Sequence, residues 1–258
     1  MPLITLTTDF GTRDWFVGTM KGVILGIAPG AAIVDITHEI PAGDIRAGAF
    51  ALAASCRFFP KGTVHVAVVD PGVGGARKAI GVQTAKYFFV GPDNGVLSFA
   101  LAREKIKSMH RLENAEYFLR PVSKTFHGRD IFGPIAAHLC LGTPVHRLGS
   151  VQKEFVRLIW PRPCIGRNWI KGEVILIDRF GNAITNIENL DLGRRSGLEI
   201  FLGRKRLCPV GEFYQSVPTG KALAVPGSTG FLEIALNGGS AAKRFRLKVG
   251  SKVCVRWL

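Results

Sequence analysis

The chain has 258 residues, of which 47% are hydrophobic and 21% are charged, a composition ordinary for a soluble globular protein of one large or two smaller domains. It contains neither a run of about 18 or more apolar residues that could cross a membrane nor the start of a signal peptide, so we expect a cytoplasmic protein with no membrane partner. The formal net charge of +15 raises the alternative of a nucleic-acid partner, but the basic residues are dispersed and we do not expect one.

The first part of the chain alternates between strand and helix patterns. Strands are predicted at residues 3–9, 31–37 and 63–70, and helices at residues 14–27 and 44–58. Asp14 is the expected N-cap of the first helix. Further strands are predicted at 78–85 and 86–91, and further helices near 95–103 and 130–141. This order implies right-handed βαβ units and a three-layer α/β/α, Rossmann-like domain.

The pattern changes after residue 158. Residues 159–169, IWPRPCIGRNW, contain two prolines and two tryptophans and predict a linker. Short strand patterns separated by glycine turns follow at 172–178, 182–187, 198–203, 222–227, 231–236 and 252–257. Residues 243–248 alternate basic and apolar side chains, as in a half-exposed strand. We therefore predict an α/β domain at 1–158, a linker at 159–169 and an all-β, barrel-like domain at 170–258.

Carboxylates lie at or near the ends of three predicted strands, at Asp9, Asp35 and Asp70. Ligands of open α/β sheets bind outside the carboxyl ends of the strands. Asp9 and Asp70 precede glycine-containing turns that let a ligand approach the backbone, whereas we interpret Asp35 as a turn former or a helix cap. A carboxylate at the end of the first strand suits a ribose, because it can accept hydrogen bonds from both hydroxyl groups of the diol.

Motifs for cofactors are missing from the sequence. The five cysteines are far apart and never form C-x-x-C, which argues against a disulfide framework and against a zinc site. Neither G-x-G-x-x-G nor G-x-x-x-x-G-K-[ST] occurs, so the predicted sheet lacks the usual pyrophosphate cradle. A nucleoside without phosphates therefore fits the first domain better than a dinucleotide.

The segment KTFHGRDIFGP, residues 124–134, contains the histidine His127 immediately before a predicted helix, where Asp130 suits the N-cap. Capping or packing is the simplest role of such a histidine. A functional role becomes the better interpretation if His127 lies close to Asp70 and Arg77 of the loop DPGVGGAR, because both segments can reach the carboxyl edge of the sheet.

In the β domain, the segment IDRFGN, residues 177–182, reads as a hairpin, and turn chemistry alone accounts for its glycine and for Asn182. The alternative is a binding site at the hairpin tip. There, Phe180 could stack on an adenine, Asn182 could form hydrogen bonds with it, and Asp178 could hold an ammonium group.

The segments TTDFG, VVDPGVGGAR, TFHGRD, IDRFGN and GSTGFLEIALNGG, in this order, resemble the S-adenosylmethionine (SAM) hydroxide adenosyltransferases, also called adenosine-forming SAM hydrolases. These enzymes are relatives of the SAM-dependent fluorinase and chlorinase. The resemblance implies an N-terminal α/β domain, a C-terminal β-barrel and a homotrimer, with sites between the N-terminal domain of one subunit and the C-terminal domain of the next. It also implies attack of water or hydroxide on the ribose C5′ of SAM, giving adenosine and methionine without a cofactor.

The resemblance further implies residue roles. The family's Asp–Arg–His set maps onto Asp70, Arg77 and His127, and its ribose-binding aspartate onto Asp9. The remaining matched positions bind the methionine ammonium (Asp178), surround the adenine (Phe180 and Asn182) and lie near the methionine carboxylate (Ser228). One departure is Thr229, which stands where the halogenases carry an arginine.

Two alternatives remain at this point. One is a halide-using enzyme, since the fluorinase has a tyrosine and a fluoride-binding serine at the positions of His127 and Gly128. The chlorinase also has a glycine at the position of Gly128. The combination of His127 with Asp70 and Arg77 is therefore the better indicator that the nucleophile is hydroxide. The other alternative is a non-catalytic module that binds SAM or adenosine.

Overall fold

Residues 2–193 and 195–257 are described by a computed structural model, in which the chain divides into two compact units, Met1–Ile159 and Trp160–Leu258. The first unit combines a mixed sheet with helices, and the second is an almost closed antiparallel barrel. The predicted fold class is therefore confirmed. None of the helices in the described part of the chain combines the length and apolar character needed to cross a bilayer.

Six strands form the sheet of the first unit, in the order β2-β1-β3-β5-β4-β6. They are β1 (Leu3–Thr8), β2 (Ala32–Thr37), β3 (Val64–Val68), β4 (Ala79–Thr84), β5 (Phe88–Pro92) and β6 (Ile106–Arg111). β2, β1, β3 and β5 run parallel, whereas β4 pairs antiparallel with β5 and β6. β3 is buried along its whole length, as expected for a central parallel strand covered on both faces.

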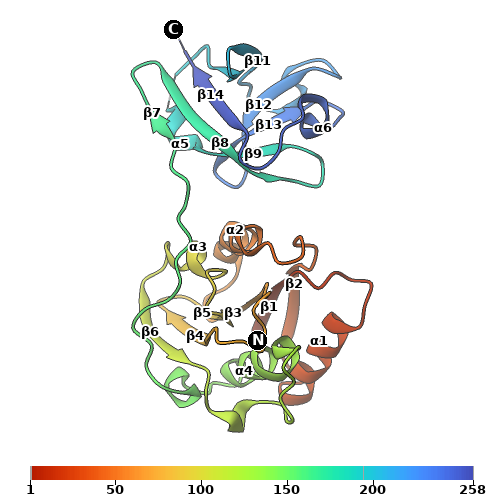
Figure 1. Ribbon diagram of the computed structural model, residues 1–258, viewed down its shortest axis with the longest axis vertical. Coiled ribbons are helices and arrows are strands. Elements are labelled where there is room, and N and C mark those ends of the chain that lie inside the picture. The colour runs from red at the N-terminus through yellow and green to blue at the C-terminus, as the bar shows by residue number, and fades with distance from the viewer. Residues whose placement is uncertain (1, 194, 258) are drawn as a thin grey trace. The chain divides into compact units, whose positions relative to one another are not determined.

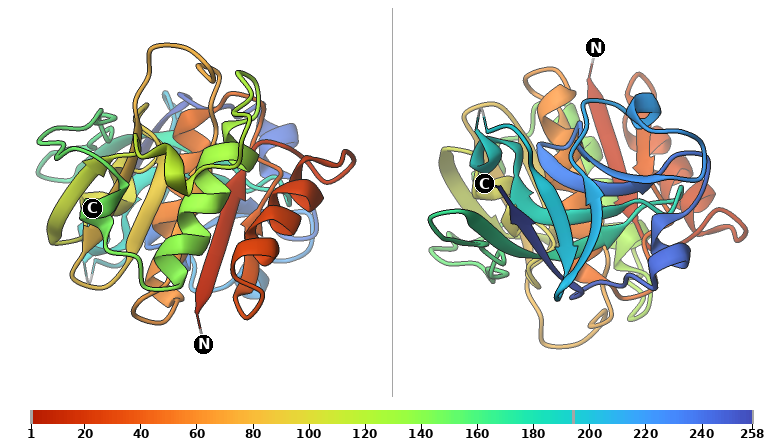
Figure 2. Two further views of the ribbon diagram at one scale, coloured as in Figure 1. Left: turned by 90° about the horizontal axis from the view of Figure 1, so that it is seen from below. Right: turned by 90° about the horizontal axis from the view of Figure 1, so that it is seen from above.

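Helices cover both faces of this sheet (Figure 1). The helices α1 (Phe16–Ile27) and α4 (Gly133–Cys140) lie side by side on one face, which Figure 2 shows in its left view. The other face carries α2 (Ile45–Ser55) and the short α3 (Ser98–Leu101). Met20 and Ile24 of α1 join Ile135 of α4 and the inner side chains of β1 and β3 in one buried apolar cluster.

The helix starts were predicted with mixed success. Asp44 caps α2, because its Oδ1 accepts a hydrogen bond from the main-chain N of Ala47 at 2.9 Å. The prediction for Asp14 is wrong, since α1 begins at Phe16 with Trp15 in the N-cap position and no side-chain cap. The chain before α1 continues instead as an exposed turn.

In the second unit, the strands pair in the order β11-β10-β14-β8-β9-β13-β12, and β7 pairs with β8. They are β7 (Cys164–Ile165), β8 (Trp169–Ile177), β9 (Ala183–Glu188), β10 (Glu199–Leu202), β11 (Lys205–Pro209), β12 (Ala222–Pro226), β13 (Phe231–Leu236) and β14 (Lys252–Arg256). A bridge between Val210 and Ala224 links the two ends of this order and nearly closes the barrel.

The strand predicted at 243–248 is wrong. Residues Ala241–Phe245 form the short helix α6, whose N-cap Ser240 accepts a hydrogen bond from the main-chain N of Lys243 at 3.2 Å. A second short helix, α5 (Asn189–Leu192), follows β9. The cap chemistry at Ser240 therefore outweighs the alternating pattern that follows it.

Candidate active site

The glycine-rich loop after β3 packs against the segment that leads to α4. Gly74 has a φ of +74°, and a Cβ added to it would lie only 2.1 Å from the carbonyl oxygen of Lys124. Only glycine combines this backbone conformation with so close an approach. The loop therefore returns Arg77 to the side of Asp70 and places both next to residues 124–128.

Asp70, Arg77 and His127 are in direct contact. The Nε of Arg77 lies 3.0 and 2.9 Å from the two carboxylate oxygens of Asp70, and its Nη2 lies 2.5 Å from Oδ2. The same Nη2 lies 2.6 Å from Nδ1 of His127. The Asp70 side chain is 4% exposed and that of Arg77 is 12% exposed. Such a shielded two-point ion pair fixes the plane of the guanidinium.

The contact with Arg77 determines where His127 carries its proton. Arginine has no acceptor atom, so Nη2 donates and Nδ1 of His127 accepts, which places the proton of the neutral imidazole on Nε2. Burial and the charge of Arg77 lower the pKa of His127, while Asp70 and Asp130 act in the opposite direction. Among the described residues no partner is recorded for Nε2, so its N–H can be donated to a ligand.

The prediction that Asp130 caps a helix is wrong. Residues Gly128–Phe132 form a π-helical turn before α4, and Asp130 is fully buried within it. Its carboxylate accepts hydrogen bonds from the main-chain N of Ser123 at 2.8 Å and from Nε of Arg129 at 2.6 Å. Asp130 therefore fastens residues 123–127 to the turn and fixes His127 in front of the glycine-rich loop.

Asp9 lines the same pocket as Asp70 and His127, together with Phe10 and Phe126. The Oδ2 of Asp9 accepts a hydrogen bond from the main-chain N of Gly43 at 2.8 Å, and no partner for Oδ1 is recorded among the described residues. The pocket has a volume of about 120 Å³. This is room for several water-sized groups, and so for a nucleophile beside at least part of a substrate.

The hairpin of the second unit joins β8 to β9. The two oxygens of Asp178 accept hydrogen bonds from the main-chain N of Asn182 at 2.8 Å and from its Nδ2 at 3.0 Å. Phe180 at the tip is 77% exposed, whereas Asn182 is only 6% exposed. Both line a pocket of about 520 Å³. An exposed aromatic ring beside a fixed amide is an arrangement that can bind a planar heterocycle.

Two further residues of this pocket are not predicted by the sequence, Tyr214 and Asn237. Asn237 belongs to the motif LNGG, whose paired glycines indicate a turn and could have drawn attention to it. Tyr214 lies in a short helical turn with no motif around it. Ser228 lies in the turn between β12 and β13 and is not among the residues lining this pocket.

The predicted site residues therefore fall into two groups, one in each unit. The first unit holds Asp9, Asp70, Arg77 and His127, and the second holds Asp178, Phe180, Asn182 and Ser228. Within the described ranges, no three or more His, Cys, Asp or Glu side chains gather closely enough to hold a metal ion.

Both units of the chain are similar to known proteins. The family model for the SAM hydroxide adenosyltransferase N-terminal domain matches residues 4–149, and that for the C-terminal domain matches residues 172–254. A Thermus thermophilus protein named (R)-S-adenosyl-L-methionine hydrolase is 39% identical over 254 residues, covering 95% of this chain and 96% of that protein. A fluorinase from an Actinoplanes species is 27% identical, covering 98% of this chain and 97% of the fluorinase. The crystal structure of an uncharacterized conserved protein from Thermotoga maritima has a TM-score of 0.93 at 38% identity, covering 99% of this chain and 100% of that one.

Proposed function

The chain belongs to the SAM hydroxide adenosyltransferase family, and we propose that it is an enzyme that hydrolyses S-adenosyl-L-methionine to adenosine and methionine. The observation that carries this proposal is the contact of Arg77 with both Asp70 and His127 beside a small pocket. Because the Thermus relative is named for the (R) epimer, the proposed substrate includes SAM with the (R) configuration at sulfur.

The proposed reaction needs a good nucleophile rather than a general acid. The water oxygen forms a bond to C5′ of the ribose, and the C5′–S bond breaks with its electron pair remaining on sulfur. Sulfur thereby leaves as the neutral thioether of methionine, and one proton of the water passes to solvent. The barrier therefore lies in the weak nucleophilicity of water and in its alignment with the C5′–S bond.

Arg77 and His127 supply the electrostatic part of the proposed mechanism. The guanidinium of Arg77 lies behind the imidazole, and its charge favours hydroxide over water in front of His127, where the Nε2–H can donate a hydrogen bond to that oxygen. His127 could either position the water or accept its proton. Occupation of Nδ1 by Arg77 favours the positioning role, since the remaining ring nitrogen carries a proton.

The substrate contacts follow from the family match and belong to the same proposal. Asp9 would hold the ribose diol, Phe180 and Asn182 the adenine, Asp178 the ammonium and Ser228 the carboxylate of the methionine part. A homotrimer with sites shared between subunits, as the family resemblance implies, would supply the second group of residues. No cofactor is needed, because the sulfonium of SAM is already a good leaving group.

A halide-using reaction is the second candidate, because a fluorinase is among the relatives. The site is less suited to fluoride in particular, since Gly128 offers no side-chain donor to that ion. A Cβ added at Gly128 would lie 3.1 Å from the ring of Phe10 and 3.3 Å from that of Phe126. A serine in this position would therefore require the aromatic wall to move.

Incubation of the purified protein with each sulfur epimer of SAM tests the proposal. We expect equal amounts of adenosine and methionine from at least one epimer, unchanged by added chloride or fluoride, and no 5′-halogenated adenosine. SAM that is bound in calorimetry but remains intact would favour the non-catalytic binding module instead.

A further inference from the structure

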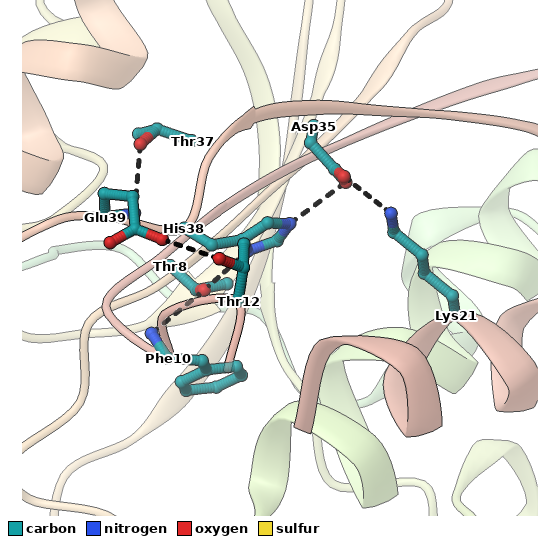
Figure 3. Close-up of polar contacts among 8 residues, drawn as sticks. All are labelled: Thr8, Phe10, Thr12, Lys21, Asp35, Thr37, His38 and Glu39. Atoms are coloured by element: carbon teal, nitrogen blue, oxygen red, sulfur yellow. Dashed lines mark hydrogen bonds and ion pairs between the residues drawn. The ribbon is translucent and has the colours of Figure 1, made fainter. Parts of the chain in front are cut away.

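A continuous series of polar contacts connects α1 to the loop after β1 (Figure 3). Nζ of Lys21 lies 2.5 Å from Oδ2 of Asp35, and Oδ1 of Asp35 lies 3.0 Å from Nε2 of His38. Nδ1 of His38 lies 2.8 Å from Oγ1 of Thr8, which also accepts a hydrogen bond from the main-chain N of Phe10 at 3.2 Å. The contacts therefore end on both neighbours of the predicted ribose-binding aspartate.

Main-chain hydrogen bonds around His38 also anchor the loop after β1. The main-chain N of Gly11 donates to the carbonyl oxygen of His38 at 2.8 Å, and that of Ile40 donates to the carbonyl oxygen of Thr8 at 3.4 Å. Gly43, which anchors Oδ2 of Asp9, belongs to the same segment between β2 and α2. The carboxylate of Asp9 thus has its position set by residues 38–43.

The histidine and the threonine of this series are too buried to meet a substrate, whereas the side chains of Lys21 and Asp35 are 32% and 37% exposed. His38 is 4% exposed and Thr8 is fully buried. The order of carboxylate, imidazole and hydroxyl is that of a nucleophilic triad, but a hydroxyl without access to ligand cannot act as a nucleophile. Partial burial of Asp35 opposes ionisation, yet the contacts with Lys21 and His38 lower the pKa of its carboxyl, so the series keeps a charged anchor. Its effect must lie in where it holds the loop.

Phe10 extends this effect to the opposite wall of the pocket. Its ring packs edge-on against Phe126, with 5.7 Å between the centroids, and it lies against Gly128. Phe126 and Gly128 are the two neighbours of His127 in the chain. A shift of the main chain at Phe10 would therefore disturb both the carboxylate of Asp9 and the aromatic wall beside His127.

We propose that His38 is a positioning residue that sets the ribose selectivity of the site. It holds Asp9 so that Oδ1, which has no recorded partner in the described part of the chain, can meet the ribose diol. The proposal rests on the ribose-binding role proposed above for Asp9. Without the imidazole, Thr8 loses its connection to Asp35. The carboxylate of Asp9 is then no longer held in the position from which it can accept hydrogen bonds from both ribose hydroxyl groups. The affinity for adenosine then falls more than the affinity for a nucleoside that lacks one of these hydroxyl groups.

Calorimetric binding of adenosine and 2′-deoxyadenosine to the full chain tests this role without requiring turnover. The wild-type protein should bind adenosine about tenfold or more tightly than the deoxy compound, because a hydrogen bond to a carboxylate is lost. His38→Gln, which removes the Nδ1 acceptor, should reduce this ratio to less than about threefold. Thr8→Val, which keeps the shape of the side chain but lacks the hydroxyl group, should reduce the ratio equally. Thr8→Ser, which keeps the hydroxyl group, should retain the wild-type ratio.

His65 provides the matched control. It is fully buried, and its Nδ1 lies 2.7 Å from Oγ1 of Thr5 on the same strand as Thr8. His65→Gln removes the same kind of contact and should leave the ratio unchanged. The inference is overturned if His38→Gln and Thr8→Val retain the wild-type ratio, or if His65→Gln lowers it equally. If the wild-type protein binds the two nucleosides equally, both this inference and the ribose-binding role of Asp9 are overturned. If it prefers adenosine as expected but leaves SAM uncleaved, only the proposed reaction is contradicted.

Discussion

Nη2 of Arg77 donates a hydrogen bond to Nδ1 of His127 across 2.6 Å, while the same guanidinium is held by the carboxylate of Asp70. A protonated His127 would direct a second N–H at this donor, so the contact and the positive charge both favour the neutral imidazole. Asp70 and His127 line the small pocket, and Arg77 contacts both of them from outside its lining, so the imidazole N–H is backed by a fixed cation. This arrangement is better suited to binding a single anionic oxygen than to abstracting a proton from water.

Arg77→Met removes the cation while keeping a side chain of similar length. We expect SAM turnover to fall by ~10²–10³, similar to the loss of one group that stabilises a developing or bound oxyanion, because both the charge of Arg77 and the orientation of His127 are lost. The Kd for adenosine should change by less than about threefold, because Arg77 is not expected to contact the nucleoside. Steady-state kinetics and calorimetry measure the two effects. Wild-type turnover would exclude Arg77 from the mechanism, and an equal loss of adenosine affinity would assign it to substrate binding.

The pKa of His127 should lie below 6.5, the ordinary value for histidine, because burial and Arg77 both lower it. The kcat/KM for SAM should therefore remain on its plateau as the pH falls to 6.5 and should decline only below it. In Arg77→Met the NMR titration midpoint of His127 should move upward, since the charges of Asp70 and Asp130 are then opposed by burial alone. A midpoint that stays unchanged in this variant would show that Arg77 does not control His127.

Gly74→Ala tests whether the approach of the loop to Lys124 assembles the site. The new Cβ would lie 2.1 Å from a carbonyl oxygen, so the loop must move and Arg77 should lose its contact with His127. We expect turnover to fall at least tenfold. The control is Gly62→Ala, because Gly62 also has a positive φ, of +92°, but nothing lies within 4 Å of its added Cβ. Both variants carry a backbone strain of about 1–2 kcal/mol, so similar activities would contradict the prediction.

His65 should make the folded protein sensitive to acid. Burial lowers its pKa to about 4, from 6.5, so the folded state favours the neutral imidazole. This contribution to the free energy of unfolding is fully present above pH 6.5 and is lost as the pH falls from 6.5 through about 4. The total loss is about 3 kcal/mol, at roughly 1.4 kcal/mol per pKa unit. Denaturant unfolding at several pH values should show a smaller decline in His65→Gln, and an equal decline would assign the acid sensitivity to other groups.

Much of the fold was predictable because local patterns and tertiary packing agree. The apolar run of β3 and the cap at Asp44 are signals of this kind. β6 was not predicted, since its sequence IKSMHR lacks an alternating pattern and the strand lies at the edge of the sheet. The basic segment of β11 was not recognised as a strand for a similar reason, because KRLCP shows no continuous apolar face.

The candidate site was predictable only in part. Asp9 and Asp70 follow strands and precede glycine turns, so their place at the sheet edge could be inferred from the sequence. The contact of Arg77 with His127 joins residues that are 50 positions apart in the sequence, and it depends on the fit of Gly74 against the Lys124 main chain. Tyr214 could not be inferred, because it reaches its pocket through a turn that carries no motif.

The origin of the 5′ oxygen of adenosine tests most directly whether this site delivers water to C5′. SAM should be turned over by the wild-type protein in ¹⁸O-labelled water containing chloride, and the products analysed by mass spectrometry. We predict one ¹⁸O atom in the 5′-hydroxyl group of adenosine, none in methionine and no chlorinated nucleoside. Unlabelled adenosine, label in methionine, or 5′-chloro-5′-deoxyadenosine as the main product would contradict attack by water at C5′.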